Sequence, residues 1–460
     1  MMFQKETIAA ISTGMCNSGI GIVRISGSEA IDIISNIFIP YKKNKDIRSV
    51  DSHTVHYGNI IDNGHVIDEV LIIIMKAPNT YTREDVVEID CHGGVLVVKK
   101  IFDLVLKNGA RCAEPGEFTK RAFLNGRIDL SQAEAVADII SAKSSLALDA
   151  SVSQLRGNIS NIIKNEREKI IYHIAFIESA LDDPEHMSVD NYGVGLKKDI
   201  NNILSVLEKL LSTSDNGKII SEGIKTVILG KPNAGKSSLM NTLLGEERAI
   251  VTDIAGTTRD TLEESMRLSD LQLNIIDTAG IRDTNDIVEK IGVERSKKIA
   301  GDADLVIYVV DASVPLDEND KDIIQIISDK KFIVLLNKTD LECIVTVEDI
   351  KKIINTEPIE ISAKNNIGLN VFEDRVRDMF YHGKISFNDE IYITNLRHKE
   401  ALTEAVESLK MVIKSIDDGM PEDFYSIDLM DAYEALGKII GEAVSDDLVN
   451  EIFSKFCMGK

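Results

Sequence analysis

The 460-residue chain is poor in several features that would assign it quickly to a class of protein. It has only 8 prolines and no stretch that is long or polar enough to predict disorder. The N-terminal residues lack the basic and apolar regions of a secretory signal. The strongest apolar run, residues 70–75, is far too short to span a membrane and instead predicts a buried strand.

Cysteine is also scarce, and basic residues are outnumbered by acidic ones, 52 to 75. The 5 cysteines are odd in number and include no Cys-x-x-Cys pair, which favours a reducing compartment and argues against structural zinc. We therefore expect a cytoplasmic protein with no membrane association. The formal net charge of −23 repels nucleic acid at long range, so a diffuse basic surface cannot be how this chain binds RNA.

Charge is unevenly distributed along the chain. Residues 99–127 have an excess of basic side chains, whereas residues 417–460 are strongly acidic. A polyanion would have to meet a local basic patch or a basic partner protein. Ordinary solvated faces explain both segments equally well.

The length exceeds what one hydrophobic core supports, so two to four domains are expected. Residues 1–118 predict an α/β domain, with strands at 20–25, 70–75 and 86–89 and a helix at 96–107. Residues 221–380 alternate strand and helix patterns, as a doubly wound parallel sheet does.

The remaining segments, residues 119–220 and 381–460, have helical patterns. Expected helices cover residues 132–147, 159–181, 200–211, 396–416 and 430–444, and residues 212–217 read as a turn-rich linker. Each helix has a wide apolar stripe that needs a partner. We therefore expect the two segments to pack on each other as one helical domain, with the nucleotide domain inserted into it.

Residues 230–237, Gly-Lys-Pro-Asn-Ala-Gly-Lys-Ser, form a complete phosphate-binding loop. A strand pattern precedes the loop and a helix pattern follows it, which is the context that makes the motif credible. Backbone N–H groups and the helix N-terminus would hold the β-phosphate, and Lys236 would reach the β and γ oxygens. The hydroxyl of Ser237 is placed to bind Mg²⁺. A chance glycine loop with a solvated lysine is the alternative.

Three further motifs follow strand patterns in the order expected of a GTPase. Asp277 begins Asp-Thr-Ala-Gly and can hold Mg²⁺ through water, while residues 337–340 read Asn-Lys-Thr-Asp. The carboxylate of Asp340 can accept hydrogen bonds from guanine N1–H and N2–H₂, a donor pair that adenine lacks, so it selects GTP. Residues 362–364, Ser-Ala-Lys, would offer a backbone N–H to guanine O6.

The segment between the first two motifs, residues 249–260, should supply a switch threonine that completes the Mg²⁺ shell, and we assign Thr258 to this position. The predicted nucleotide-binding residues are Asn233, Ala234, Gly235, Lys236, Ser237, Ser238, Thr252, Asp253, Ile254, Ala255, Gly256, Thr257, Thr258, Asp277, Thr278, Ala279, Gly280, Asn337, Lys338, Asp340, Ser362, Ala363 and Lys364.

The residue after Asp-Thr-Ala-Gly is Ile281, where signalling GTPases have a glutamine that orients the attacking water. Isoleucine cannot hydrogen-bond water, so either hydrolysis is slow or another group acts. The downstream candidates are Arg282, Asp283, Asp286 and Glu289. Glu289 is also placed to be an ordinary acidic residue at a helix start.

With these motifs, the chain resembles the MnmE (TrmE) family of bacterial tRNA-modifying GTPases along essentially its whole length. Outside the GTPase motifs the resemblance rests on four stretches: Gly-Ile-Gly-Ile-Val-Arg-Ile-Ser-Gly at 19–27, Pro-Gly-Glu-Phe at 115–118, Arg-Ala-Phe-Leu-Asn at 121–125 and Phe-Cys-Met-Gly-Lys at 456–460. The GTPase motifs alone fit several families, and these stretches make the match specific.

The resemblance implies three parts: a folate-binding and dimerising domain at 1–118, a helical domain at 119–220 and 381–460, and an inserted GTPase domain at 221–380. It implies GTP hydrolysis that drives addition of a carboxymethylaminomethyl-type group to carbon 5 of the wobble uridine of certain tRNAs. A homodimer would act with an MnmG-type flavoprotein that uses FAD and NADH, in a heterotetramer that shares the tRNA.

Particular residues follow from the resemblance position by position. A tetrahydrofolate derivative of the 5-formyl or 5,10-methylene type would contact Arg24, Glu88, Arg127, Cys457 and Lys460. The family usually has a lysine at the position of Arg127. A Cys-x-x-x ending also resembles a prenylation box, but Gly459 and Lys460 fit that box poorly.

The resemblance also suggests what replaces the missing glutamine. A K⁺ ion held by Asn233, Thr252, Ile254 and Thr257 would neutralise charge near the β–γ bridge, as an arginine finger does. Glu289 matches the proposed general base, acting through water, and Arg282 would belong to the second switch.

Two rival functions remain open at this point. A ribosome-assembly GTPase would use hydrolysis only to time its release from rRNA, but such proteins usually add a basic RNA-binding module. A purely regulatory switch would use the flanking domains as an effector scaffold. Folate binding to the N-terminal part separates both from a tRNA-modifying enzyme.

Overall fold

The fold is taken from a computed structural model that describes residues 6–42, 46–183, 186, 192–243, 264–268, 271–276, 301, 303–381, 391–442, 444–457 and 459. The chain divides into two compact units. The first comprises Met1–Ser141, Ser151–Ser205 and Glu400–Lys460, and the second comprises Ala142–Ala150 and Val206–Lys399. The limits of the three expected domains stay a prediction.

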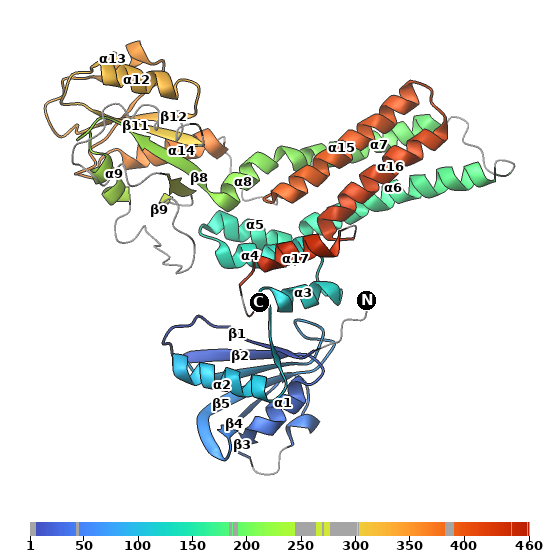
Figure 1. The fold of residues 1–460 in the computed structure, drawn as a ribbon. Helices are drawn as coiled ribbons and strands as arrows, with labels where there is room; N and C mark the ends of the chain where they lie inside the picture. The colour runs from blue at the N-terminus through green and yellow to red at the C-terminus, as the bar shows by residue number, and fades with distance from the viewer. Residues whose placement is uncertain are drawn as a thin grey trace. The chain divides into compact units, whose positions relative to one another are not determined.

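A seven-stranded sheet in the order β3-β4-β5-β6-β2-β1-β7 forms the N-terminal part of the first unit (Figure 1). Its neighbouring strands are antiparallel except for β1 and β7. The strands are β1 (Ile8–Ile11), β2 (Ile20–Ser26), β3 (Phe38–Pro40), β4 (Thr54–Asp62), β5 (His65–Met75), β6 (Val86–His92) and β7 (Arg111–Cys112). A 3₁₀ turn covers Ile47–Ser49.

Alternation along the strands gives this sheet two different faces. Val23 and Ile89 share a core with apolar residues of α1 (Ala30–Ile37) and α2 (Val95–Lys107). Because successive side chains point to opposite faces, Arg24 and Glu88 belong to the other face. The predicted strands at 20–25, 70–75 and 86–89 and the helix at 96–107 are all found.

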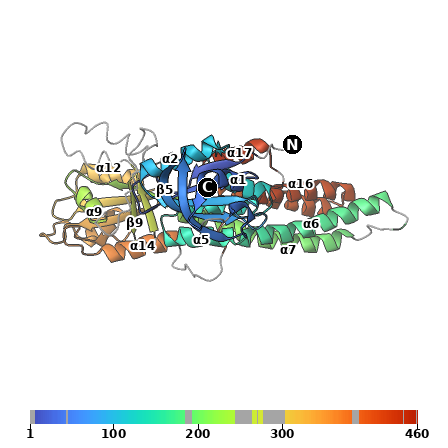
Figure 2. The ribbon, with the colours of Figure 1, turned by 90° about the horizontal axis from the view of Figure 1, so that it is seen from below.

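Helices account for most of the rest of the first unit, and the longest is α6 (Asn158–Asp182). They are α3 (Glu117–Leu124), α4 (Leu130–Ser141), α6 (Asn158–Asp182), α16 (Glu422–Ile440) and α17 (Asp446–Ser454), with residues 151–155 of α5 (Ser145–Leu155), 192–205 of α7 (Tyr192–Ser212) and 400–417 of α15 (Leu396–Asp417). Helices α6, α7 and α16 run side by side (Figure 2). The buried Arg167 of α6 stacks on Tyr433 of α16 and pairs with Glu442. Segments that precede and follow the nucleotide motifs in sequence therefore pack together.

The second unit is built on a six-stranded sheet in the order β13-β12-β11-β8-β10-β9. Its strands are β8 (Ile224–Leu229), β9 (Glu264–Leu268), β10 (Leu271–Ile275), β11 (Leu305–Asp311), β12 (Phe332–Asn337) and β13 (Ile359–Glu360). All pairs are parallel except β9 with β10, so the sheet is mixed rather than wholly parallel.

Helices cover both faces of this second sheet, as expected for a doubly wound fold. One core joins the sheet to Leu239 of α9 (Lys236–Leu243) and Phe372 of α14 (Leu369–Tyr381). The other joins it to Ile327 of α12 (Glu318–Ile327) and Ile350 of α13 (Val347–Ile353). Helix α8 (Ser214–Glu222) leads into β8. No helix in the described part of the chain combines the length and apolar character that a membrane span requires.

Two sequence predictions about helices were wrong. The single helix expected at 132–147 is divided into α4 and α5, because the side chain of Ser144 accepts a hydrogen bond from the N–H of Ala147 and starts a new helix. The linker expected at 212–217 lies mostly within α8. Gly217 lets this helix approach the backbone of Ile393, and Ile220 is buried in the core of the second unit.

Candidate functional sites

The phosphate-binding loop lies between β8 and α9, as the sequence predicted. Gly230 and Gly235 have positive φ angles of 153° and 95°. A Cβ at Gly235 would lie 2.2 Å from Nδ2 of Asn337, so only glycine fits there. Asn233 also has a positive φ, of 64°, which asparagine tolerates better than most residues. The loop backbone is therefore curled tightly enough to surround a phosphate group.

Lys236 is folded back onto this loop. Its Nζ donates to the carbonyl oxygens of Gly230, at 2.7 Å, and Lys231, at 2.8 Å. Burial lowers the pKa of Lys236, because the charged amine is removed from water. A phosphate group would replace these neutral acceptors with full negative charge. Lys231 anchors the same loop through ion pairs to Asp317, at 3.1 Å, and Asp320, at 2.7 Å.

Asn337 joins three of the predicted motifs. Its Nδ2 donates to the carbonyl of Ala234 at 2.9 Å, and its Oδ1 accepts from the backbone N–H of Ala363 at 3.1 Å. Asn337 is buried at the end of β12. The asparagine thus holds the phosphate loop and the Ser-Ala-Lys loop in a fixed relation.

The predicted base-recognition residues also come together. Ser362 donates from Oγ to Oδ1 of Asp340 at 2.7 Å, and this bond holds the pKa of Asp340 below its usual range. Lys338 forms an ion pair with Asp311 at 2.6 Å. Asp340 is therefore ionised and oriented for a ligand that donates two hydrogen bonds.

Asp311 was not predicted as a site residue. It ends the fully buried strand β11, and a carboxylate directly after an apolar strand was the signal that could have found it. Ser238 and Lys364 are exposed beside the site. The predicted or candidate residues that lie outside the described part of the chain are Thr252, Asp253, Ile254, Ala255, Gly256, Thr257, Thr258, Asp277, Thr278, Ala279, Gly280, Arg282, Asp283, Asp286, Glu289 and Lys460.

A second group of predicted residues meets on the outer face of the N-terminal sheet. Arg24 of β2 and Glu88 of β6 are paired across the two strands, with Nε and Oε1 2.7 Å apart. The guanidinium of Arg24 lies 5.9 Å from the ring centroid of Tyr81 and 5.7 Å from that of Phe118. Arg127 lies over the same tyrosine ring at 4.7 Å. Arg24 and Arg127 therefore both lie at the Tyr81 ring, and Glu88 joins the group through Arg24.

Gly459, near the other end of the sequence, lies against this group. Arg24 donates from Nη1 to the carbonyl of Gly459 at 3.2 Å, and Ser12 donates to the same oxygen at 3.3 Å. The carbonyl of Cys457 accepts from the N–H of Gly116, while the Cys457 side chain is exposed. Gly116 has a φ of 69°, and a Cβ there would meet the carbonyl oxygen of Phe453 at 2.7 Å.

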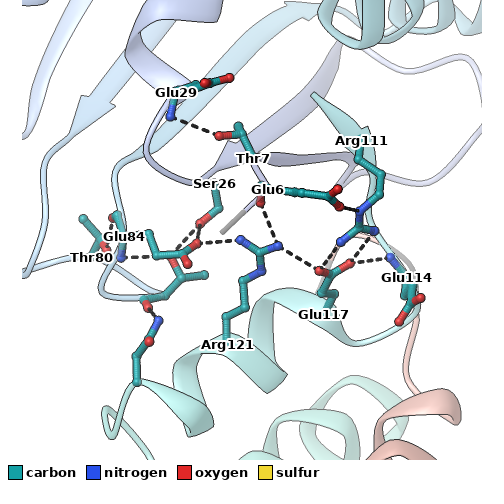
Figure 3. Close-up of polar contacts among 12 residues, drawn as sticks. Glu6, Thr7, Ser26, Glu29, Thr80, Glu84, Arg111, Glu114, Glu117 and Arg121 are labelled. Atoms are coloured by element: carbon teal, nitrogen blue, oxygen red, sulfur yellow. Dashed lines mark hydrogen bonds and ion pairs between the residues drawn. The ribbon is translucent and has the colours of Figure 1, made fainter. Parts of the chain in front are cut away.

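Two of the stretches that carry the family resemblance have a structural role beside this group (Figure 3). Glu117 accepts from Arg111 at 2.7 Å and from Arg121 at 2.9 Å, and Arg121 also pairs with Glu84 at 3.0 Å. Burial alone would raise the pKa of Glu117, but the hydrogen bonds from Arg111, from the N–H of Glu114 and from Arg121 outweigh it and lower the pKa. This network fixes α3 against the sheet.

Tyr81 was missed by sequence reasoning. Its ring lies beneath Arg127, and its hydroxyl is 2.9 Å from Oγ1 of Thr119. The signal was available, because Tyr81 is a lone aromatic residue in the polar segment 79–85. An aromatic ring beside two arginines can stack with a flat heterocyclic ligand.

Two family models match the chain. One described as "MnmE helical domain" matches residues 130–457, and one described as "GTP-binding protein TrmE N-terminus" matches residues 7–127. Together these matches include most of the residues that form both sites.

Curated relatives match over the whole chain. A tRNA modification GTPase MnmE from Lachnoclostridium phytofermentans is 58% identical over 99% of this chain and 100% of its own. The protein of the same name from Acetivibrio thermocellus is 48% identical over 100% of both chains. A solved structure of Era in complex with MgGDPNP and 16S ribosomal RNA is 27% identical and covers 40% of this chain and 66% of that chain. Its TM-score of 0.26 is too low to support an argument.

Proposed function

Because the chain belongs to the MnmE family of tRNA modification GTPases, we propose that it hydrolyses GTP to drive modification of carbon 5 of the wobble uridine in certain tRNAs. The product carries a carboxymethylaminomethyl-type group. The single structural observation that carries the GTP-hydrolysis part of this proposal is the position of Asn337, which joins the phosphate loop to the loop that would meet the guanine base. The tRNA part rests on the family.

Asp340 supports GTP rather than ATP as the substrate. Its carboxylate is held by Ser362 and has a lowered pKa, so it accepts hydrogen bonds at neutral pH. Guanine presents N1–H and N2–H₂ as neighbouring donors, whereas adenine has no such pair. Two charge-assisted hydrogen bonds would therefore favour guanine strongly.

The donors around the phosphate loop suit Mg²⁺ and K⁺. The Ser237 hydroxyl, with Thr258 and with Asp277 through water, would hold Mg²⁺, which prefers oxygen ligands. The amide oxygen of Asn233, with Thr252, Ile254 and Thr257, would hold K⁺. The positive φ angles of Gly230, Asn233 and Gly235 curl the loop, which suits close approach of a phosphate and its cations. When bound, the cations would offset negative charge on the phosphates.

Lys236 would bind the β and γ oxygens in place of the carbonyls that it now contacts. Glu289 would act as the general base on the attacking water, because Ile281 cannot orient it. Arg282 would belong to the second switch.

The group around Tyr81 would bind a tetrahydrofolate derivative of the 5-formyl or 5,10-methylene type as one-carbon donor. Tyr81 offers a ring for stacking, and Glu88 offers a carboxylate that is already oriented by Arg24. Cys457 and Lys460 would complete the site from the other end of the sequence. Arg127 keeps the positive charge of the lysine that the family usually has there.

Partners complete the proposal. A homodimer would assemble with an MnmG-type flavoprotein that uses FAD and NADH, in a heterotetramer that binds tRNA in the cytoplasm. The net charge of −23 is consistent with a complex in which a basic surface of the partner contacts the tRNA phosphates.

The GTP assignment is tested by Asp340→Asn. Asparagine keeps one acceptor oxygen and replaces the other with an NH₂ donor, which faces a donor of guanine. GTP affinity should therefore fall at least about 100-fold. Xanthosine triphosphate has a carbonyl where guanine has its 2-amino group, so the same variant should gain affinity for it. Nucleotide titration and phosphate release measure both.

The matched control is Asp349→Asn. Asp349 is the third residue of α13 and accepts from the N–H and the hydroxyl of the N-cap residue Thr346. Asparagine keeps an acceptor oxygen there, so the nucleotide preference should not change. An Asp340→Asn variant that binds GTP normally would refute the assignment of the base-recognition residue.

A further inference from the structure

Two arginines flank the turn that ends α3, close to Tyr81. Arg83 donates from Nη1 to the carbonyl of Asn125 at 2.9 Å, which holds its guanidinium against the turn. A Cβ at Gly126 would lie only 3.7 Å from the same nitrogen. Arg127 follows in sequence and lies over the Tyr81 ring at 4.7 Å. Both arginines are exposed.

Neither arginine has an ion pair in the part of the chain that the structure describes. The neighbouring carboxylates have other partners. Glu84 accepts from Ser26 and Arg121, and Asp85 accepts from the N–H of Ala77. Asp129 accepts from Ser131, Gln132, Ser160 and Lys164. Two arginines without an acidic partner are notable in a chain with a net charge of −23.

The backbone at Arg83 is also unusual. Its φ of 61° lies in the left-handed region, where a residue with a Cβ is strained. This conformation places the side chain against Asn125, which in turn donates from Nδ2 to the carbonyl of Thr82 at 2.6 Å. The segment and the turn thus hold each other, and one N–H of the exposed Arg83 guanidinium is already bound to the turn.

We propose that Arg83, with Arg127 beside it, forms an anion subsite for the γ-linked glutamate chain of a folate polyglutamate. The inference rests on the proposed folate binding at Tyr81 and extends it to the tail of the ligand. A guanidinium has five N–H donors, and only one of those of Arg83 has a partner that the structure shows. The planar fork of the remaining donors matches a carboxylate.

A short carboxylate chain fits these observations better than tRNA does. A short chain of carboxylates needs only a few cationic side chains next to Tyr81, and Arg83 and Arg127 are two such side chains. A tRNA backbone would extend over a larger surface of a strongly acidic protein and would be repelled there.

The test compares the mono- and triglutamate forms of 5-formyltetrahydrofolate by calorimetry on the full chain. The wild-type protein should bind the triglutamate about three to ten times more tightly, since each exposed ion pair adds a modest amount. Arg83→Gln should lose most of this gain. Raising the salt concentration should reduce the gain in the wild-type protein.

Two further variants separate charge from folding. Arg83→Gly removes the side chain but suits the positive φ, so a well-folded variant that loses the gain confirms the role of the charge. Arg48→Gln is the matched control, because Arg48 is exposed in the same sheet domain and paired with Asp32. It should keep the full gain.

The outcomes distinguish the two proposals. If the monoglutamate does not bind the wild-type protein, the folate proposal fails. If it binds and the triglutamate binds no better, or if both Arg83 variants keep the gain, the subsite is refuted. Loss of tRNA binding in Arg83→Gln with the glutamate gain intact would overturn the subsite and assign the arginine to nucleic acid.

Discussion

The two candidate sites are assembled over very different distances along the sequence. In the nucleotide site, the hydrogen bonds of Asn337 span 103 residues to Ala234 and 26 residues to Ala363. In the site around Tyr81, Arg24 and Gly459 are 435 residues apart and still in contact. One site is a row of loops at the end of a sheet, and the other requires two distant parts of the chain to meet.

This difference determines how well each site can be predicted from sequence and which substitutions should abolish its ligand binding. The loops of the nucleotide site follow neighbouring parallel strands, so strand order alone brings them to one edge. No comparable rule brings Gly459 to β1 and β2. Damage to the long-range contacts should therefore disable the Tyr81 site and leave the nucleotide site intact, and damage to Asn337 should do the reverse.

The largest effect is expected from Gly116→Ala. The new Cβ would meet the carbonyl oxygen of Phe453 at 2.7 Å and Cβ of Phe456 at 2.9 Å, in a backbone with a φ of 69°. Strain and overpacking together should lower the free energy of unfolding of the first unit by about 2–5 kcal/mol. Folate affinity should fall sharply. GTP affinity should stay within about twofold, a change in binding free energy that is smaller than the net contribution of one hydrogen bond.

Gly64→Ala is the control for backbone strain alone. Gly64 has a φ of 83°, but nothing lies within 4 Å of the position of its Cβ. Gly64→Ala should therefore lower the free energy of unfolding less than Gly116→Ala does, and it should bind folate normally. Equal effects of the two variants on folate would contradict the role of the Phe453 and Phe456 contacts.

Asn337→Ala should produce the opposite pattern. It leaves the carbonyl of Ala234 and the N–H of Ala363 without their partner in a buried place, which costs about 1–3 kcal/mol for each group. GTP affinity and the stability of the second unit should both fall, while folate titration should be unchanged. The exposed Asn319 gives the control, Asn319→Ala. Loss of folate affinity in Asn337→Ala would show that the two sites are energetically coupled.

The smallest effect is a pH dependence carried by Glu117. Its pKa is lowered from the usual 4.5, so the ionised form stabilises the first unit above that pH, and the stabilisation is lost as the pH falls through the lowered value. Glu117→Gln should cost about 1 kcal/mol at pH 7. Urea unfolding at pH 7 and at pH 4 should show this difference shrinking in acid.

Glu318→Gln provides the comparison for Glu117, because the Glu318 side chain is 86% exposed and should show little change at either pH. A difference between wild type and Glu117→Gln that grows in acid would mean that the sign of the pKa shift is wrong. GTP affinity should be the same in all three proteins.

The family prediction was confirmed, and the fold of the second unit follows closely from the sequence. Each motif stood directly after a strand pattern, so Lys236, Asn337 and Asp340 could be placed without knowing the rest of the chain. Asp311 was missed because its partner, Lys338, is known only once β11 and β12 are seen to be neighbours.

The first unit was less accessible to sequence reasoning. Arg24 and Glu88 could be named by resemblance, but their pairing depends on the register between β2 and β6. Tyr81 and Arg83 carry no motif, and their importance comes from Arg127 and Asn125, which lie on the far side of α2 and β7 in sequence. The break at Ser144 was missed because one capping bond outweighed a continuous helical pattern.

The contact between Ser12 and Gly459 also has a consequence for synthesis on the ribosome. The two residues are 447 positions apart, and at roughly 5–20 residues per second the second appears roughly 20–90 seconds after the first. For that time the N-terminal sheet has emerged but lacks the segment that lies against Arg24 and Gly116. A chain that stops before residue 456 leaves this surface uncovered, so truncated products should be recognised and removed by cellular quality control.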